Sequence, residues 1–178
     1  MKLFSISLVL SALTVWISPA SAQSDTLFLH NGKVLAAKLL SKGSLTITYQ
    51  MPSRGNAIFT NSIYSVHRIK YTDGSMDTLS ERIEITNEDD WERVMLLEDV
   101  SAVAGLIRKQ EIKGNSAMVN LHTPQTADAR AWMNLKKAAA RLGCPFVFVH
   151  FDRESTLSPL LIGIGSKQAV KRGIAFSY

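Results

Sequence analysis

One stretch of this chain, from Thr126 to Phe151, combines an amphipathic helix, a sharp stop and an apolar strand. Thr126 is the expected N-cap, because its hydroxyl can accept a hydrogen bond from a free N–H of the first turn. Five apolar side chains then recur at the spacing of one helix face: Ala131, Leu135, Ala138, Ala139 and Leu142. Gly143 suits the left-handed residue after a helix, and Pro145 forbids continuation. The stretch therefore predicts a helix packed by its alanine-rich face on a sheet.

The strand of this unit is apolar on both of its faces. It covers residues 146–151, and only His150 interrupts the run of phenylalanine and valine. A strand covered on one side alone would alternate apolar with polar residues. We therefore expect an inner strand, with the helix on one face of its sheet and other apolar residues on the opposite face.

The first 22 residues have the pattern of a secretory signal peptide. A basic start, Met1-Lys2, precedes a short apolar run over residues 3–17 and the sequence Ala20-Ser21-Ala22. The run is shorter than the ~20 residues of a membrane-spanning helix. We expect cleavage after Ala22 and a periplasmic or secreted protein, with a retained N-terminal anchor as the alternative. The residue directly after the cleavage point is Gln23 and not cysteine, so a lipoprotein anchor is not indicated.

The basic excess of the chain is modest. The sequence has a net charge of +5, one unit of which belongs to Lys2, and its basic residues are dispersed. A nucleic-acid interface would need clustered Lys and Arg with interleaved aromatic residues, so no nucleic-acid partner is expected. No second long apolar run predicts a membrane span. Cys144 is the single cysteine, so the fold depends on core burial without an internal disulfide.

The half of the chain that follows the signal peptide is typical of short antiparallel strands. Asn31-Gly32 lies between two apolar runs and predicts a hairpin with a type I′ turn. Asp73-Gly74 is a second turn signal, and residues 45–49 alternate at period two. Further strands are expected over 57–60, 63–71 and 76–79, although the apolar spacing within 63–69 also fits a helical turn. These signals predict a small β-barrel or β-sandwich over residues 23–82.

This half resembles the N-terminal β-domain of secreted proteins from Bacteroidetes-type bacteria. The matching residues are Asp25-Thr26-x-Phe28-Leu29-x-Asn31-Gly32-Lys33-Val34, residues 63–66, and the closing Ile69-Lys70-Tyr71-x-Asp73-Gly74. The resemblance implies a small SH3-like or β-sandwich unit in a two-domain protein and carries no catalytic residues. Ala36-Ala37 stands where that family often has glycine.

An acidic stretch separates this half from the rest. Seven carboxylates lie from Glu84 to Asp99, and Arg93 is the one basic residue among them. An exposed surface or a linker is the expected role, because the run lacks the frame of a calcium loop. Residues 94–97, 103–112 and 173–178 read as strands around the helix–strand unit, and 117–121 and 160–164 are further strand candidates. We expect a ββαββ open sandwich over residues 83–178, and an α+β protein overall.

The last third of the chain resembles small envelope domains, among them the Rcs-type stress-sensor lipoproteins and the YbjQ-like domains. The matching residues are Leu135-Lys136-x-Ala138-Ala139-x-x-Leu142-Gly143, the apolar strand, and Gly173-x-Ala175-x-x-Tyr178. The resemblance implies a fold and no activity. The Rcs-type sensors depend on disulfides, and a chain with one cysteine does not share that mechanism.

Few residues are candidates for a functional site. Cys144 and His150 would lie ~20 Å apart along one strand, too far for a nucleophile–base pair. A buried, structural Cys144 is expected instead. His150, Asp152 and His67 are the candidates for a binding site, and a hydrogen-bonded strand-end histidine is the structural alternative for His150.

Neither a metal site nor a phosphate-binding loop is predicted. His30, His67 and His122 do not have the spacing of metal ligands. Residues 163–167 contain glycines and a lysine, but they lack the order that a P-loop requires. No cofactor is expected.

All of the pronounced signals concern the fold, so the sequence predicts a non-catalytic extracytoplasmic binding or structural module. Its expected partner is an envelope protein or a small ligand. The basic residues Lys167, Lys171 and Arg172 allow peripheral association with the envelope. One alternative is a small-molecule-binding protein or hydrolase with a site between the two domains. That alternative needs His67, His150 or Asp152 to meet other polar groups in a cleft. The other alternative is an assembly protein that pairs through an exposed strand edge.

Overall fold

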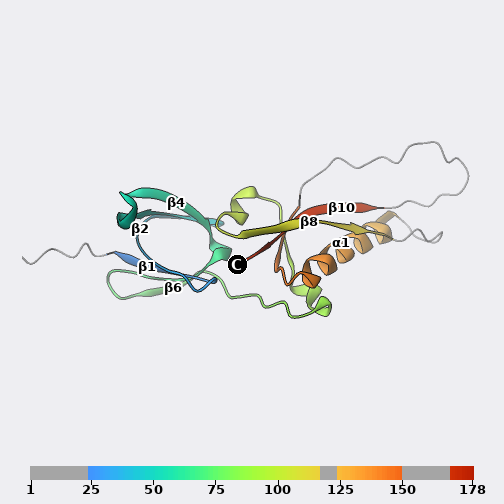
Figure 1. Ribbon diagram of the computed structural model, residues 1–178, viewed down its shortest axis with the longest axis horizontal. Coiled ribbons are helices and arrows are strands. Elements are labelled where there is room, and N and C mark those ends of the chain that lie inside the picture. Colours follow the sequence, from blue (N-terminus) through green and yellow to red (C-terminus); the bar gives the residue numbers. More distant parts are fainter. Residues whose placement is uncertain (1–23, 117–123, 150–168) are drawn as a thin grey trace, which may run out of the picture.

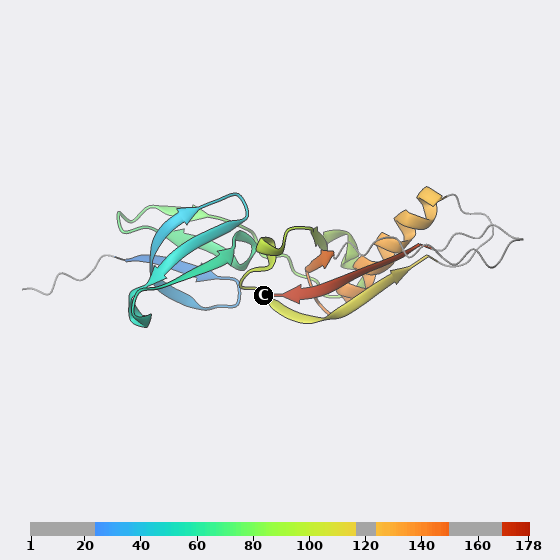
Figure 2. The ribbon, with the colours of Figure 1, turned by 90° about the horizontal axis from the view of Figure 1, so that it is seen from above.

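The computed structural model describes residues 24–116, 124–149 and 169–178. These residues form two sheets and one α-helix, which confirms the α+β class. Figures 1 and 2 show the two sheets at opposite ends of an elongated molecule, with the helix beside the second sheet. No helix among the described residues is long and apolar enough to span a membrane. The predicted signal peptide, and the strand candidates at 117–121 and 160–164, lie outside the described residues.

The first sheet has six antiparallel strands in the order β4-β3-β2-β1-β5-β6. They are β1 (Asp25–Leu29), β2 (Val34–Lys42), β3 (Thr46–Met51), β4 (Ala57–Ser62), β5 (Val66–Lys70) and β6 (Met76–Thr78). The period of two along β3 is confirmed, because Ile47, Tyr49 and Met51 are buried while the residues between them are half-buried. The segment predicted as a strand over 63–71 is instead divided. Ile63–Ser65 forms a 3-10 turn, and the strand starts at Val66.

Both predicted hairpin turns occur, but the type I′ geometry predicted for Asn31-Gly32 is wrong. Gly32 has a positive φ of 83°, whereas Asn31 does not, and a type I′ turn needs positive φ at both central residues. Gly32 N–H donates to Leu29 O, and Leu29 N–H donates to Lys33 O. These bonds close a three-residue loop that ends in a left-handed glycine. The same pattern recurs at Gly74, whose φ is 88°.

The second sheet has four strands in the order β7-β9-β10-β8. They are β7 (Met95–Leu97), β8 (Ile107–Asn115), β9 (Phe146–Val149) and β10 (Val170–Ser177), and β7 runs parallel to β9 while the other pairs are antiparallel. As predicted, the apolar strand after the helix is an inner strand. Val147 packs on the helix side, and Phe146 lies on the other side among Leu97, Ala102 and Phe176.

The helix α1 (Pro124–Arg141) packs its small side chains on the second sheet. It starts at Pro124, so the prediction of Thr126 as N-cap is wrong; proline suits a first helical position because its missing N–H is not needed there. Leu135 is fully buried, but Leu142 is 40% exposed, contrary to the prediction. Leu142 follows the last helical residue, where Gly143, with φ of 63°, turns the chain away.

The close approach of α1 to the sheet depends on Gly114 in β8. A Cβ atom at this position would lie 2.8 Å from Leu135 Cα and still closer to Ala131 O and Leu135 N. Real Cβ atoms do not approach backbone atoms so closely. The missing side chain therefore sets the distance between helix and strand.

The acidic stretch is hydrogen-bonded rather than simply exposed. The 3-10 turns η3 (Glu88–Arg93) and η4 (Val100–Val103) both lie in or beside it. Asn87 and Asp90 form a reciprocal capping box at the start of η3, and Asp99 caps η4 through Ser101 N–H. Glu88 accepts hydrogen bonds from Arg141 at the end of α1. These carboxylates position the connection between the two sheets.

The two sheets meet through an apolar and aromatic contact. Phe146 of β9 packs against Tyr64 in the 3-10 turn between β4 and β5, with ring centroids 5.6 Å apart, and against Tyr178, at 5.3 Å. Ser62 N–H donates to Ala104 O at 2.7 Å across the same contact. Ile83 N–H donates to the Tyr178 hydroxyl at 2.9 Å. The segment that links the sheets therefore belongs to a packed joint.

Candidate functional site

The structure places one predicted candidate, His67, in a cluster of polar side chains at the joint. The histidine cluster consists of His30, His67, Ser80, Arg82 and Tyr178. His30 lies in the loop after β1, His67 lies in β5, and Ser80 and Arg82 lie in the segment after β6. The other two candidates, His150 and Asp152, lie outside the described residues, as does His122.

Short contacts hold the two imidazoles of the cluster together. The ring centroids of His30 and His67 are 5.3 Å apart, and those of His30 and Tyr178 are 4.7 Å apart. His30 Nε2 lies 2.9 Å from Ser80 Oγ, and His67 Nδ1 lies 3.2 Å from Ser80 O. Arg82 Nη1 donates to His30 O at 2.9 Å. The sequence signals did not predict that these residues meet, because four separate segments of the chain supply them.

The hydrogen-bond partners of Ser80 argue against a serine nucleophile. Ser80 Oγ lies 3.0 Å from Ile63 O and 2.9 Å from Val66 O, and a carbonyl oxygen only accepts. The single hydroxyl proton of Ser80 therefore forms a hydrogen bond to these backbone carbonyl oxygens. The network then assigns the Nε2 proton to His30, which donates to Ser80 Oγ. His30 has no free lone pair directed at this hydroxyl, so it is not placed to act as its general base.

Burial lowers the pKa of His30 below its usual value of 6.5, and the nearby His67 and Arg82 lower it further. The folded protein therefore favours neutral His30, while the unfolded chain takes up a proton below about pH 6.5. Because the unfolded state binds more protons in that range, the free energy of unfolding is expected to fall as the pH falls below 6.5. Urea denaturation from pH 7.5 downward measures this, with His30→Gln as the control that keeps a donor for Ser80. The effect is expected to be weaker in this variant, and parallel pH curves for the two proteins would contradict the assignment.

Cys144 is the structural residue that the sequence predicted. It is fully buried, and burial raises the pKa of its thiol. The Sγ atom lies 3.6 Å from Leu142 O, its hydrogen-bond acceptor. Because the thiolate is the reactive form, a buried thiol with a raised pKa is a poor nucleophile. Within the described ranges, no group of three or more His, Cys, Asp or Glu side chains is arranged to hold a metal ion.

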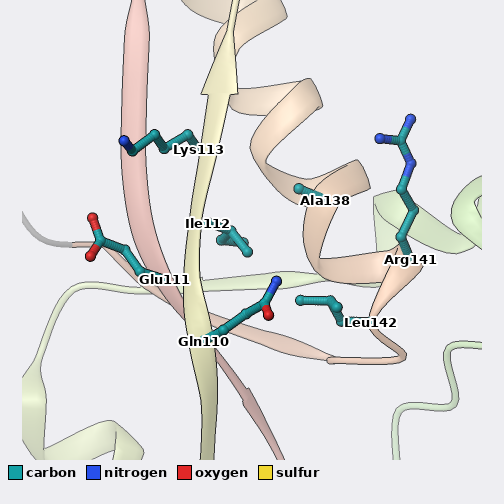
Figure 3. Close-up of a pocket in the computed structure, with 7 residues that line it drawn as sticks. All are labelled: Gln110, Glu111, Ile112, Lys113, Ala138, Arg141 and Leu142. Atoms are coloured by element: carbon teal, nitrogen blue, oxygen red, sulfur yellow. The ribbon is translucent and has the colours of Figure 1, made fainter.

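A groove of about 600 Å³ lies between β8 and the C-terminal end of α1 (Figure 3). It is lined by Gln110, Glu111, Ile112, Lys113, Ala138, Arg141 and Leu142. Side chains alternate between the two faces of a strand, so four consecutive lining residues mean that the groove follows the edge of β8. Figure 3 shows Gln110 and Ile112 on the helix side of this strand. β8 is the last strand in the order of this sheet. It pairs with β10 along one of its edges, and the groove follows its other edge.

The helix wall of the groove is fixed by an ion pair. Arg141 donates from Nε and Nη2 to the two carboxylate oxygens of Glu88, at 2.7 and 2.8 Å. These hydrogen bonds from Arg141 lower the pKa of Glu88. Arg141 is thereby directed toward η3, which leaves Leu142 and Ala138 to face the edge of β8. The groove thus combines an apolar wall with a strand edge that pairs with no other strand of the described residues.

Sequence reasoning did not identify this groove, although one signal for it exists. Residues 107–113 of β8 carry Arg108, Lys109, Glu111 and Lys113, and all four are exposed. A strand rich in charged side chains, lysine above all, is typical of the edge of a sheet. The prediction of a strand over 103–112 overlapped β8 but started too early, because residues 100–103 form η4.

Comparisons with known proteins identify no relative of this chain. A scan with protein-family models, a search of curated proteins and a search of solved structures found no match to this chain.

Proposed function

We propose that this protein is a non-catalytic, extracytoplasmic binding module that takes up an extended peptide segment along the edge of β8. The groove between β8 and α1 carries the proposal, because it places beside an apolar wall a strand edge that no strand in the described part of the chain pairs with. An extended peptide can add to such an edge through main-chain hydrogen bonds, while a neighbouring pocket takes alternate side chains. Leu142, 40% exposed, and Ala138 are the residues that such side chains would contact.

Charge favours an acidic segment as the occupant. Arg108, Lys109 and Lys113 stand against Glu111 on this part of β8, so the edge has a basic excess. A second copy of the same edge would bring the basic side chains of both strands together, and like charges on paired strands are unfavourable. The partner is therefore another protein of the envelope with a peptide that alternates apolar and acidic residues.

Three further observations support the parts of this proposal. The apolar run of residues 3–17 and the Ala20-Ser21-Ala22 site support export, and the N-terminal residue of the exported protein, expected to be Gln23, tests it. The grouping of strands into β1–β6 and β7–β10 supports a separate small β-unit over 23–82, expected as a barrel or sandwich, and a ββαββ unit over 83–178. The hydroxyl of Ser80, which donates to the backbone, speaks against the alternative of a hydrolase at the joint.

The experiment uses an eight-residue probe peptide in which valine alternates with glutamate. We expect saturable binding to the purified protein, measured by fluorescence anisotropy of the labelled peptide, and slower amide hydrogen exchange over residues 107–113. Leu142→Asp places a carboxylate in the apolar wall, and it is expected to weaken binding by about tenfold or more, a loss of roughly 1.4 kcal/mol.

Ile58→Asp is the matched control. Ile58 is 64% exposed on β4, an edge strand of the other sheet, so this variant carries the same change of charge on a different edge. Binding that is equal in both variants, or exchange protection on β4 in place of β8, would contradict the proposal. A probe with lysine in place of glutamate should bind less tightly, because the edge is basic.

A further inference from the structure

We propose a second binding site, on the first sheet, for the phosphate group of a small organic phosphate. A pocket of about 330 Å³ lies at the end of β1 beside β5 and the segment after β6. Five of its lining side chains carry nitrogen donors: His30, Lys33, His67, Arg68 and Arg82. None of its lining residues is acidic. The site lies on a different sheet from the peptide groove and does not depend on it.

The cations of this pocket have no carboxylate partners among the described residues. The four ion pairs of the described residues use Lys42, Lys137, Lys171 and Arg141. None of them uses Lys33, Arg68 or Arg82. Three full positive charges therefore line one pocket without an ion pair to any carboxylate of the described residues. A dianion matches this charge better than a monoanion does.

Arg68 is the residue on which the site depends. The register of β1 and β5 places it opposite Phe28, and its guanidinium carbon lies 4.7 Å from the centroid of that ring. Its Nε atom is buried and has no hydrogen-bond partner within the described part of the chain. A buried donor without a partner is costly, so Arg68 is the residue lining this pocket that has an unmet hydrogen bond.

Existing contacts already orient two of the other donors. Arg82 is held by its bond to His30 O and lies over the Tyr178 ring, 5.5 Å from the centroid. His67 uses Nδ1 toward Ser80 O, which leaves its second ring nitrogen for another partner. Guanidinium groups bind phosphate oxygens through paired N–H donors, and preorganised donors lose little entropy on binding.

The rest of the pocket sets the class of ligand. Phe28, Leu29 and Val34 supply apolar surface next to the cations. The volume lies at the lower end of the range for small-molecule sites, roughly 300–1,000 Å³. These features fit a phosphate monoester on a compact apolar or aromatic body, either free in solution or as the headgroup of a lipid.

The test measures binding of phenyl phosphate to the purified protein by calorimetry. Saturable binding is expected, with an affinity at least about tenfold above that for inorganic phosphate, a difference of roughly 1.4 kcal/mol from the apolar body. Arg68→Met keeps an apolar stem on Phe28 and removes the charge, and it is expected to abolish this binding. The matched control is Arg54→Met, because Arg54 also lies over a ring, 5.7 Å from the Phe59 centroid, but outside the pocket.

Each other outcome decides against the site as proposed. Equal loss in both arginine variants would mean that general charge, not the pocket, binds the phosphate. Binding of inorganic phosphate as tight as that of phenyl phosphate would exclude an organic body. Phosphatidic acid vesicles provide the lipid comparison, and binding to them without binding to phenyl phosphate would exclude a small ligand. If Arg68→Met does not fold by circular dichroism, Arg82→Gln replaces it with the same expected loss.

Discussion

Replacing Gly114 by alanine is expected to destabilise the second sheet by roughly 3 kcal/mol, the upper end of the usual cost of overpacking. The new methyl group would lie 2.8 Å from Leu135 Cα and closer to two other backbone atoms of α1. Backbone atoms of a helix cannot rotate away as a side chain can, so the whole helix must shift. Urea denaturation followed by the fluorescence of Trp91 and Trp132 measures the change, because both residues pack against the core under α1.

Gly43→Ala is the control for this substitution. A Cβ atom at Gly43 would lie 3.4 Å from the nearest atom, Thr46 O, which is an ordinary contact, and the position has no positive φ. Its stability is expected to change by less than about 0.5 kcal/mol, as for most surface substitutions. A Gly114→Ala variant as stable as Gly43→Ala would mean that α1 does not lie as close to β8 as described here.

Replacing Phe146 by alanine is expected to cost roughly 3–5 kcal/mol, the range for truncation of a buried aromatic residue. Phe146 is 1% exposed and touches Tyr178 and Tyr64, which lies in the 3-10 turn between β4 and β5 of the first sheet. Its removal therefore weakens both the second sheet and the contact between the sheets. Tryptophan fluorescence, which reports on the second sheet, is expected to change at lower urea than far-ultraviolet circular dichroism, which also reports on the first.

Phe146→Leu keeps most of the apolar volume and serves as the control for that experiment. It is expected to lose less stability than Phe146→Ala and to keep the two transitions together. If both probes report one coincident transition in Phe146→Ala, then the sheets unfold as a single unit and the joint does not depend on this ring.

The sequence predicted those parts of the fold that depend on local periodicity. The helix, the inner strand after it and the left-handed Gly143 follow from the spacing of residues 131–147, and the structure contains all three. The errors lie at the ends of elements. Leu142 matches the helical spacing, yet the helix stops at Arg141, so the residue projects into the groove instead of the core. Periodicity identifies a face but does not fix the residue at which it ends.

Neither candidate site was predictable in the same way. His30 and His67 meet because β1 pairs with β5, and Ser80 and Arg82 join them because the chain folds back after β6. The groove exists because β10 pairs with one edge of β8 and no other strand in the described ranges pairs with the other edge. Both arrangements depend on pairing between distant segments, and no local pattern specifies which strands become neighbours. Of the three predicted candidates, only His67 lies in the described residues, and its partners were not foreseen.

The pairing of β8 with β10 has a consequence for the timing of folding. Ile107 pairs with Ser177, and Asn115 pairs with Val170, so the longest ladder of the second sheet joins segments far apart in the chain. Bringing two such distant segments together costs loop-closure entropy, so strand pairs of this kind form slowly. The second sheet is therefore completed only after residues 170–177 have been synthesised, whereas all six strands of the first sheet lie within residues 25–78 and are available much earlier.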